Sequence, residues 1–240
     1  MTERIIEARH VTKFLGAGAA QVAALRDVDL SLDGGELTVL LGPSGSGKTT
    51  LLSILGCMLT PNQGTVQICG TATADASAEG LAAIRRRHIG FVFQSFHLFP
   101  TLTAAENVLL ALDVRGERGE QTKTKAHAVL ERVGLAHKRG AFPRELSGGE
   151  QQRVAIARAI VAEPSAILAD EPTAALDTGN GQAIMSILAR IAHERDRAVL
   201  VVTHDARLHK FADRIIHIED GHLTREEVGG AKRQQLRSSA

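Results

Sequence analysis

The segment GPSGSGKT at residues 42–49 restricts the possible folds of this chain more than any other feature. It matches the P-loop pattern G-x-x-x-x-G-K-[ST], with the strand-like run TVLL before it and an apolar helical stripe over residues 51–55 after it. Glycines let such a loop wrap around phosphates, so that backbone N–H groups and a helix N-terminus face the negative charge. A chance match in a glycine-rich turn is the alternative, and the two correct flanks argue against it.

The motif also assigns chemistry to individual side chains. The Lys48 ammonium is expected to reach the β- and γ-phosphates of a nucleotide, and the Thr49 hydroxyl is expected to bind Mg²⁺. The sequence therefore predicts a nucleotide site at one strand-to-helix turn. Its candidate residues are Gly42, Pro43, Ser44, Gly45, Ser46, Gly47, Lys48, Thr49 and Thr50.

The order of the predicted elements indicates an α/β fold. About the first 40 residues contain short strand-like runs, RIIEARHVTKF, VDLSL and ELTVLLG, and two later strands enclose the basic helix LAAIRRRH. Residues 101–162 follow a mostly helical pattern. From residue 166 onward, apolar strands alternate with helices, which predicts a parallel sheet buried on both faces. A helical block therefore interrupts an α/β core.

Composition excludes several classes of protein. Among 240 residues, 28 basic and 27 acidic side chains nearly cancel, and the aromatic residues are limited to seven Phe. We therefore expect no nucleic-acid partner, because neither a positive field nor a stacking platform is indicated. No apolar run approaches the roughly 18 residues of a membrane span, and the start MTERIIEARH lacks a signal core. Two cysteines without metal-like spacing favour a reducing cytosol.

Polar side chains follow three of the predicted strands. Asp170 and Glu171 end the run AILADE, His204 follows AVLVVT, and Gln94 follows IGFVF. Ligands of a parallel sheet lie just beyond such strand ends. Asp170 is expected to act near Mg²⁺, and Glu171 to polarise an attacking water. A solvated strand end is the alternative for each residue, and the nearby P-loop favours the functional interpretation.

The loop after Gln94, QSFHLFPTLT, leads into the helical block. Its residues Phe96, Leu98 and Phe99 fit a core position and the lining of a docking cleft equally well, so both interpretations stay open.

The segment LSGGEQQR at residues 146–153 predicts a helix start. Ser147 and Glu150 have the spacing of a capping box. The box does not explain Gly148 and Gly149, because glycine costs about 1 kcal/mol relative to alanine inside a helix. Two glycines keep the helix end free of side chains, so that its N–H groups can approach an anion. Since the chain has its own P-loop, the segment is predicted to serve the site of another subunit.

These segments, in this order, resemble those of the ATP-binding cassette ATPases of ABC transporters, from about Ile5 to Thr224. LSGGEQQR distinguishes that family from other P-loop NTPases. The resemblance implies an α/β P-loop NTPase with a RecA-like core, an N-terminal antiparallel β subdomain and an inserted α-helical subdomain. The nucleotide-binding domain is expected over residues 1–225, with the helical subdomain at about 95–162. Residues 226–240 are expected to form a disordered, polar and basic tail.

The resemblance also implies roles for the motifs, with ATP and Mg²⁺ as the cofactors. Residues 42–49 resemble Walker A, 166–170 Walker B and 174–177 the D-loop. Phe14 takes the place of an aromatic residue that stacks on adenine, with a buried strand residue as the alternative. The implied catalytic residues are Glu171, His204, Lys48 and Gln94, and the implied metal ligands are Thr49, Gln94 and Asp170. The signature residues implied to act on a partner's nucleotide are Ser147, Gly148, Gly149 and Gln151.

Within the family, ILGCMLTPNQG, RRRHIGFVFQSFHLFPTLTAAENV and ILADEPTAALD look most like the MacB/LolD/DevA branch, and ILGCML resembles the DevA-type ATPases of heterocyst glycolipid exporters. The chain departs from that branch at Ala174-Ala175, where a glycine is commoner, and at Phe14, where a tyrosine is usual. The resemblance implies a homodimer that powers an FtsX- or MacB-like integral membrane permease, with a periplasmic adaptor protein. Its expected location is cytoplasmic, on the inner face of the cell membrane.

Three other functions remain open at this stage. The first is an FtsE-like ATPase that drives a permease-like signalling partner without transport. The others are a cassette protein that acts on DNA or ribosomes, and a regulatory nucleotide-binding module without turnover. The single cassette disfavours the second, and the presence of Glu171 and His204 disfavours the third.

Overall fold

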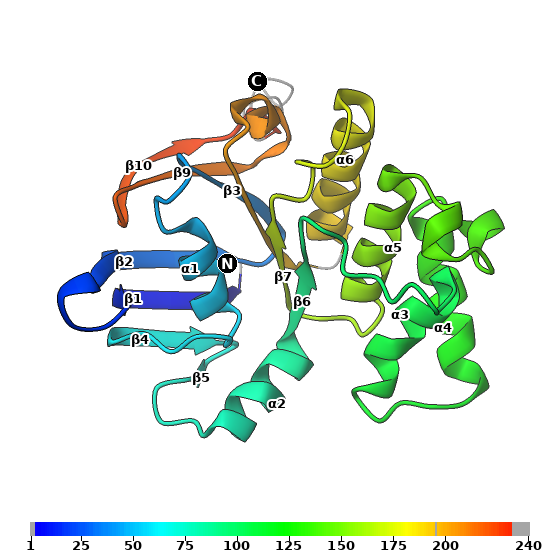
Figure 1. Cartoon of the computed structure of the whole chain (residues 1–240), viewed down its shortest axis with the longest axis horizontal. Coiled ribbons are helices and arrows are strands. Elements are labelled where there is room, and N and C mark those ends of the chain that lie inside the picture. Colours follow the sequence, from blue (N-terminus) through cyan, green and yellow to red (C-terminus); the bar gives the residue numbers. More distant parts are fainter. Residues whose placement is uncertain (1–2, 195, 232–240) are drawn as a thin grey trace.

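A mostly parallel sheet forms the centre of the computed structural model, which describes residues 3–194 and 196–231 (Figure 1). Its strand order is β10-β9-β3-β8-β7-β6, and only the edge strand β10 pairs in the antiparallel sense. The P-loop and the strand-end residues follow β3, β6, β7 and β8, whose carboxyl ends share one edge of the sheet. The strands are β3 (Glu36–Leu41), β6 (Ile89–Val92), β7 (Ala166–Asp170), β8 (Ala198–Thr203), β9 (Arg214–Glu219) and β10 (His222–Val228).

The central strands are buried on both faces, as the sequence predicts. On β3, Val39 packs into one apolar cluster, while its neighbour Leu40 packs into another on the opposite face. Val201 and Val202 of β8 divide in the same way. Successive side chains of a strand point to opposite faces, so both layers need apolar residues.

The second sheet is antiparallel and has the order β2-β1-β4-β5. It shares an apolar cluster with helix α1 (Lys48–Leu55) and with the parallel sheet. The first strand agrees with the expected run RIIEARHVTKF to within one residue, whereas the second is much longer than the expected run VDLSL, because it pairs with the first over most of its length. The strands are β1 (Arg4–Leu15), β2 (Val22–Asp33), β4 (Gln63–Ile68) and β5 (Thr71–Ala72), with the 3-10 turn η1 (Gly18–Ala20) joining the first two.

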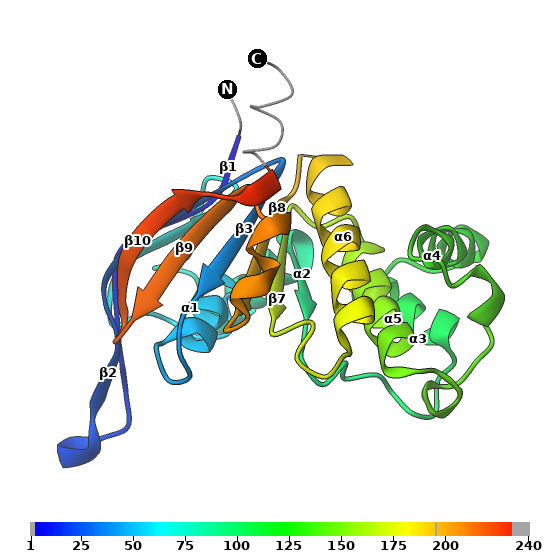
Figure 2. The same cartoon turned by 90° about the horizontal axis from the view of Figure 1, so that it is seen from above.

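The helical block lies at the end of the molecule opposite the antiparallel sheet (Figure 2). Helices α3 and α5 contact each other, and both contact α4. Helix α6 packs between this block and the parallel sheet, in the same apolar cluster. The helices are α2 (Ala78–His88), α3 (Ala104–Asp113), α4 (Glu120–Arg132), α5 (Gly148–Ile160) and α6 (Thr178–Glu194), and the further 3-10 turns are η2 (Ala136–Lys138), η3 (Pro143–Glu145) and η4 (Ala206–Phe211).

The expected start of the polar tail at residue 226 falls inside a strand. Strand β10 runs to Val228, where it pairs with Arg214 of β9. Arg214 Nε also lies 2.6 Å from Glu226 Oε1, so the charged end of β10 is held by its neighbour. Residues 232–240 of the expected tail lie outside the described residues. Within the described part of the chain, no helix combines the length and apolarity needed to cross a membrane.

Candidate active site

A cleft of about 1190 Å³ opens at the carboxyl edge of the parallel sheet. It extends from the P-loop to the tip of the β1–β2 hairpin and to the turn between β9 and β10. Most residues predicted from strand ends and from the P-loop meet there. The lining residues are Leu15, Val22, Ala23, Ala24, Arg26, Ser44, Gly45, Gly47, Lys48, Thr49, Thr50, Gln94, Asp170, Glu171, His204, Asp220, Gly221 and His222.

The P-loop has the backbone shape that its glycines predict. Gly45 and Gly47 adopt φ angles of +81° and +100°, which favour glycine, and a Cβ atom on Gly47 would lie 2.4 Å from the Ala24 oxygen. Lys48 begins α1 and donates to the carbonyl oxygens of Gly42 and Pro43 at 2.8 and 2.7 Å. The ammonium group is therefore held across the loop, beside the N-terminus of α1. This arrangement fits a polyphosphate, because loop, helix end and ammonium all present positive charge to one point.

Oxygen and amide groups gather next to the P-loop. Thr49 Oγ1 lies 3.4 Å from Asp170 Oδ1, and Gln94 lines the same cleft. Burial raises the pKa of the Asp170 carboxyl, and the charge of Glu171 adds to this. A hydroxyl, a carboxylate and an amide are the oxygen donors that suit Mg²⁺, which also keeps waters and phosphate oxygens as ligands. The residues present therefore fit a magnesium–nucleotide complex.

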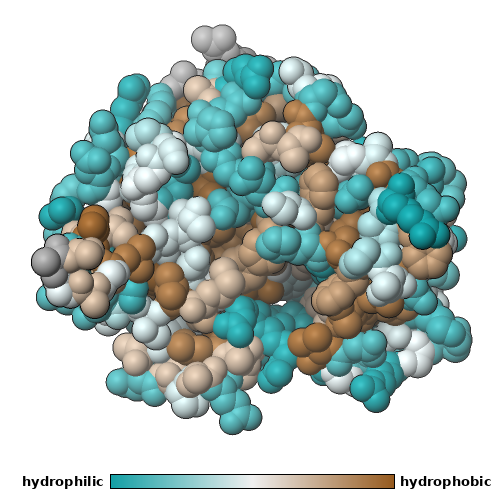
Figure 3. Space-filling model, in the orientation of Figure 1, coloured by the Kyte–Doolittle hydropathy of each residue, from teal (hydrophilic) through white to brown (hydrophobic). Residues whose placement is uncertain are grey.

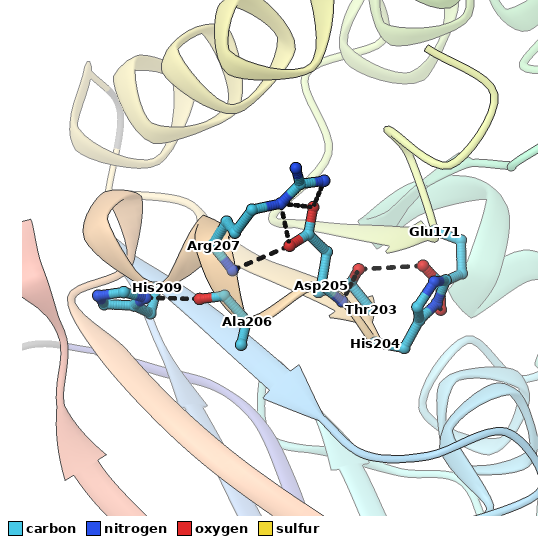
Figure 4. A network of polar contacts seen from close by, with 7 residues as sticks. All are labelled: Glu171, Thr203, His204, Asp205, Ala206, Arg207 and His209. Carbon is cyan, nitrogen blue, oxygen red and sulfur yellow. Dashed lines mark hydrogen bonds and ion pairs between the residues drawn. The ribbon is translucent and has the colours of Figure 1, made fainter. Parts of the chain in front are cut away.

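Glu171 is held by the last residue of β8 and by the residue after it (Figure 4). Its Oε1 lies 2.8 Å from Nδ1 of His204, and its Oε2 accepts a hydrogen bond of 3.0 Å from the Thr203 hydroxyl. Its backbone N–H donates to the Val202 oxygen, and its φ of +45° lies in the left-handed region. Thr203 is not among the residues predicted from the sequence, although a polar residue at the end of the apolar run AVLVVT is a signal that could have identified it.

Several predicted residues do not line the cleft. Phe14 is half-buried on β1 and is absent from the lining, whereas Leu15 and Val22 line it and are 42% and 64% exposed. Gly42, Pro43 and Ser46 form the base of the P-loop without lining the cleft. Ser46 is 3% exposed.

The signature segment, residues 146–151, also lies away from the cleft of its own chain. Ser147 caps α5 in a capping box, in which its N–H donates to Glu150 Oε2 at 2.8 Å. Gln151 donates to the Leu146 oxygen at 3.0 Å. The predicted helix start is thus confirmed, and the segment does not contribute to the cleft of the same chain.

The parallel sheet, the P-loop and the strand-end carboxylates define a P-loop nucleotide-binding protein. A family model described as ABC transporter matches residues 25–174, and the chain belongs to that family. It is an ATPase cassette of the family, as the MacB/LolD-type resemblance predicts.

The relatives differ in how much of their length the chain covers. The macrolide export ATP-binding/permease protein MacB of Hahella chejuensis is 42% identical over 240 residues, which are the whole of this chain but 36% of the relative. The chain thus spans about a third of the length of the MacB relatives. The lipoprotein-releasing system ATP-binding protein LolD of Bordetella pertussis is 44% identical over 218 residues, which are 91% of this chain and 94% of the relative.

Two solved structures have the same fold. A dimeric post-hydrolysis structure of the ATP-binding cassette MJ0796, bound to ADP and Pi, has a TM-score of 0.85 and 43% identity over 93% of this chain and 98% of that chain. The structure of cbiO1 from Clostridium perfringens, part of the transporter complex cbiONQ, has a TM-score of 0.85 and 26% identity over 98% of this chain and 92% of that chain. The α/β fold of an ABC ATPase is therefore confirmed.

Proposed function

We propose that the chain is the ATP-hydrolysing subunit of a transporter, which dimerises on ATP and powers export or extraction of a substrate by an FtsX- or MacB-like permease. One observation carries this proposal. The P-loop, Asp170, Glu171 and His204 share one cleft, while the signature segment of the same chain does not line it. Such a site has the groups that ATP hydrolysis needs, but its own signature segment does not cover the place where the nucleotide would bind.

The chain's residues divide the work of hydrolysis. Lys48 and the N-terminus of α1 neutralise phosphate charge, and Thr49, Asp170 and Gln94 would hold the Mg²⁺ ion. Bound Mg²⁺ supplies positive charge that stabilises the transferring phosphoryl group. Glu171 orients the attacking water and accepts its proton, and His204 steadies the γ-phosphate.

The signature segment completes the site in a dimer. Ser147, Gly148, Gly149 and Gln151 of one subunit would face the nucleotide bound by the P-loop of the other. The free N-terminus of α5 suits this role, because a helix N-terminus attracts an anion. ATP drives closure if it binds the closed dimer better than the open one, and hydrolysis then releases the subunits. The dimeric state of the similar cassette MJ0796 supports this arrangement.

A second surface suits a protein partner. A groove of about 530 Å³ lies between α2, α3 and α5 and corresponds to the hollow between α2 and the helical block in Figure 3. Phe99 and Val114 both line it and are 50% and 61% exposed, and exposed apolar side chains that gather at one groove indicate an interaction site. Leu98, in contrast, packs against the core. In the loop after Gln94, the core interpretation therefore applies to Leu98 and the docking interpretation to Phe99.

We assign this groove to the permease. The chain would then lie on the inner face of the cell membrane and reach a periplasmic adaptor only through that permease. Co-purification of the full chain with its membrane partner tests this part. An FtsX-like partner together with a periplasmic hydrolase activator would indicate the FtsE-like role instead of transport.

Glu171→Gln tests the hydrolytic function. The amide keeps the size of the side chain but cannot accept the proton, so ATP turnover should fall at least about a hundredfold, while nucleotide binding is retained. Light scattering should show a dimer that forms with ATP and persists. Glu79→Gln, an exposed change on α2, is the matched control and should behave like the parent. Turnover at the parent rate in Glu171→Gln would show that Glu171 does not have the proposed role.

A further inference from the structure

The two carboxylate oxygens of Glu171 have unequal partners. The Oε1 partner, His204, has a side chain that is 66% exposed, whereas the Oε2 partner, Thr203, is fully buried. Exposed side chains change rotamer within nanoseconds, and a buried side chain at the end of a central strand does not move freely. The bond to His204 is therefore the one that can open.

The hydrogen-bond roles of the Thr203 hydroxyl follow from its neighbours. The backbone N–H of Asp205 points at Thr203 Oγ1 at 3.1 Å, and an N–H can only donate. The hydroxyl accepts that bond and has one proton of its own, which it donates to Glu171 Oε2 at 3.0 Å. Figure 4 shows the resulting chain of contacts from Asp205 through Thr203 to Glu171.

The position of Thr203 is itself fixed by the sheet. It ends β8 and pairs with Leu41, the residue directly before the P-loop. On the other side of β8, Asp170 pairs with Val202. The hydroxyl is thus held at a constant place relative to the P-loop and to β7, from which Glu171 extends.

We infer that Thr203 is a positioning residue for hydrolysis, which fixes Oε2 of Glu171 and leaves Oε1 as the oxygen that takes the proton of the attacking water. The water oxygen bonds to the γ-phosphorus, its proton passes to Oε1, and the bond from that phosphorus to the leaving oxygen of ADP breaks. His204 covers Oε1 until its side chain turns away. This inference rests on the proposed hydrolytic role of Glu171.

Substitutions of Thr203 in the full chain test the inference through steady-state ATP hydrolysis. Thr203→Val keeps the shape and removes the hydroxyl, so kcat should fall about tenfold to a hundredfold, the range expected when a hydrogen bond to a charged group is lost. KM for ATP should stay within about twofold, because a positioning residue does not bind the nucleotide. Thr203→Ser restores the hydroxyl and should recover most of kcat.

Thr38→Val is the matched control. Thr38 is also a buried threonine, on the adjacent strand β3, and its hydroxyl bonds Glu36 away from the cleft. If Thr203→Val does not fold, Thr203→Ala and Thr203→Ser form a second pair that differs only in the hydroxyl. Equal kcat in Thr203→Val and Thr38→Val, or in the Ala and Ser variants, would overturn the inference. If Glu171→Gln abolishes turnover in the same assay, such a result removes the role of Thr203 and leaves the proposed function intact.

Discussion

At the scale of single residues, the two glycines at the start of α5 have different surroundings. A Cβ atom on Gly149 would lie 2.5 Å from Asn180 Oδ1, while one on Gly148 would lie 3.4 Å from the nearest atom, on Leu176. Asn180 cannot turn away without loss, because its side chain bonds Asp177 at 2.6 Å. Packing within the chain therefore explains Gly149 but not Gly148, so substitutions of Gly148 test the role between subunits with little effect on the fold.

Substitutions of these glycines should separate the two roles. Gly149→Ala should lower the free energy of unfolding by about 1–3 kcal/mol, the usual cost of overpacking, whereas Gly148→Ala should change it by less than about 0.5 kcal/mol. Urea denaturation measures both. Gly148→Asp should leave ATP binding by the monomer intact and block ATP-driven dimerisation, because it adds a negative charge where a phosphate would approach. Normal dimerisation of Gly148→Asp in light scattering would contradict the model of a shared site.

At the scale of the elements, one arginine joins three helices. Arg115 follows α3 and donates to the backbone oxygens of Arg86 and Arg87 at the end of α2, at 2.8 and 2.7 Å. It also donates to the oxygen of Ala162, just after α5. Helix ends leave carbonyl oxygens without partners inside the helix, so one guanidinium satisfies two helix ends at once. Arg115 thereby links the helical block to α2, beside the groove lined by Phe99 and Val114.

Arg115→Met should test this attachment. Methionine keeps much of the apolar stem but has no donors, so the free energy of unfolding should fall by about 2 kcal/mol. Arg115→Lys should recover little, because an ammonium lacks the planar fork. The matched control is Arg118→Met, since Arg118 is exposed and makes one ion pair of 3.6 Å with Asp113. Equal stability of the two methionine variants in urea would contradict the attachment.

Helices α3 and α5 have the same kind of N-terminal cap. Both begin with a capping box, in which Glu106 bonds Thr103 and Glu150 bonds Ser147. The backbone N–H of Thr103 lowers the pKa of Glu106, and that of Ser147 lowers the pKa of Glu150. Because these pKa values are lower in the folded state, the boxes stabilise the fold above the ordinary glutamate pKa and lose that contribution as the pH falls below it.

At the scale of the whole molecule, the cleft connects the two sheets. Its apolar wall comes from Leu15 and Val22 of the antiparallel sheet, and its polar wall from the edge of the parallel sheet. A ligand that touches both walls should stabilise the complete fold and not one layer alone. By mass action, a ligand present at a hundred times its dissociation constant raises the free energy of unfolding by about 2.7 kcal/mol.

Leu15→Ser should therefore weaken the stabilisation by Mg²⁺-ATP. We expect the apolar hairpin tip to contact the adenine, because Leu15 and Val22 form the apolar part of the cleft lining. A serine at residue 15 removes that contact without changing the P-loop. Thermal unfolding with a slowly hydrolysed ATP analogue measures the effect as a smaller rise of the midpoint. Val228→Ser, at a residue of similar exposure on β10, is the control and should keep the full rise. An equal rise in both variants would exclude Leu15 from the nucleotide site.

The sequence by itself determined the features that local chain chemistry specifies. The P-loop, the capping box at Ser147 and the strand ends at Asp170 and His204 each lie within a few residues, so motif spacing and periodicity were sufficient to predict them. The family follows from the same segments, because their order along the chain is itself sequence information.

Only the tertiary structure decided which side chains of distant segments meet. Successive side chains of β1 point to opposite faces, and the pairing with β2, which has register shifts around Lys13, fixes which face meets the cleft. Leu15, and not Phe14, lines it. Likewise, the bond between Thr203 and Glu171 depends on the pairing of β7 with β8, and the constraint on Gly149 depends on the position of α6. Contacts of this kind join residues about 30 positions apart, and no local pattern specifies them.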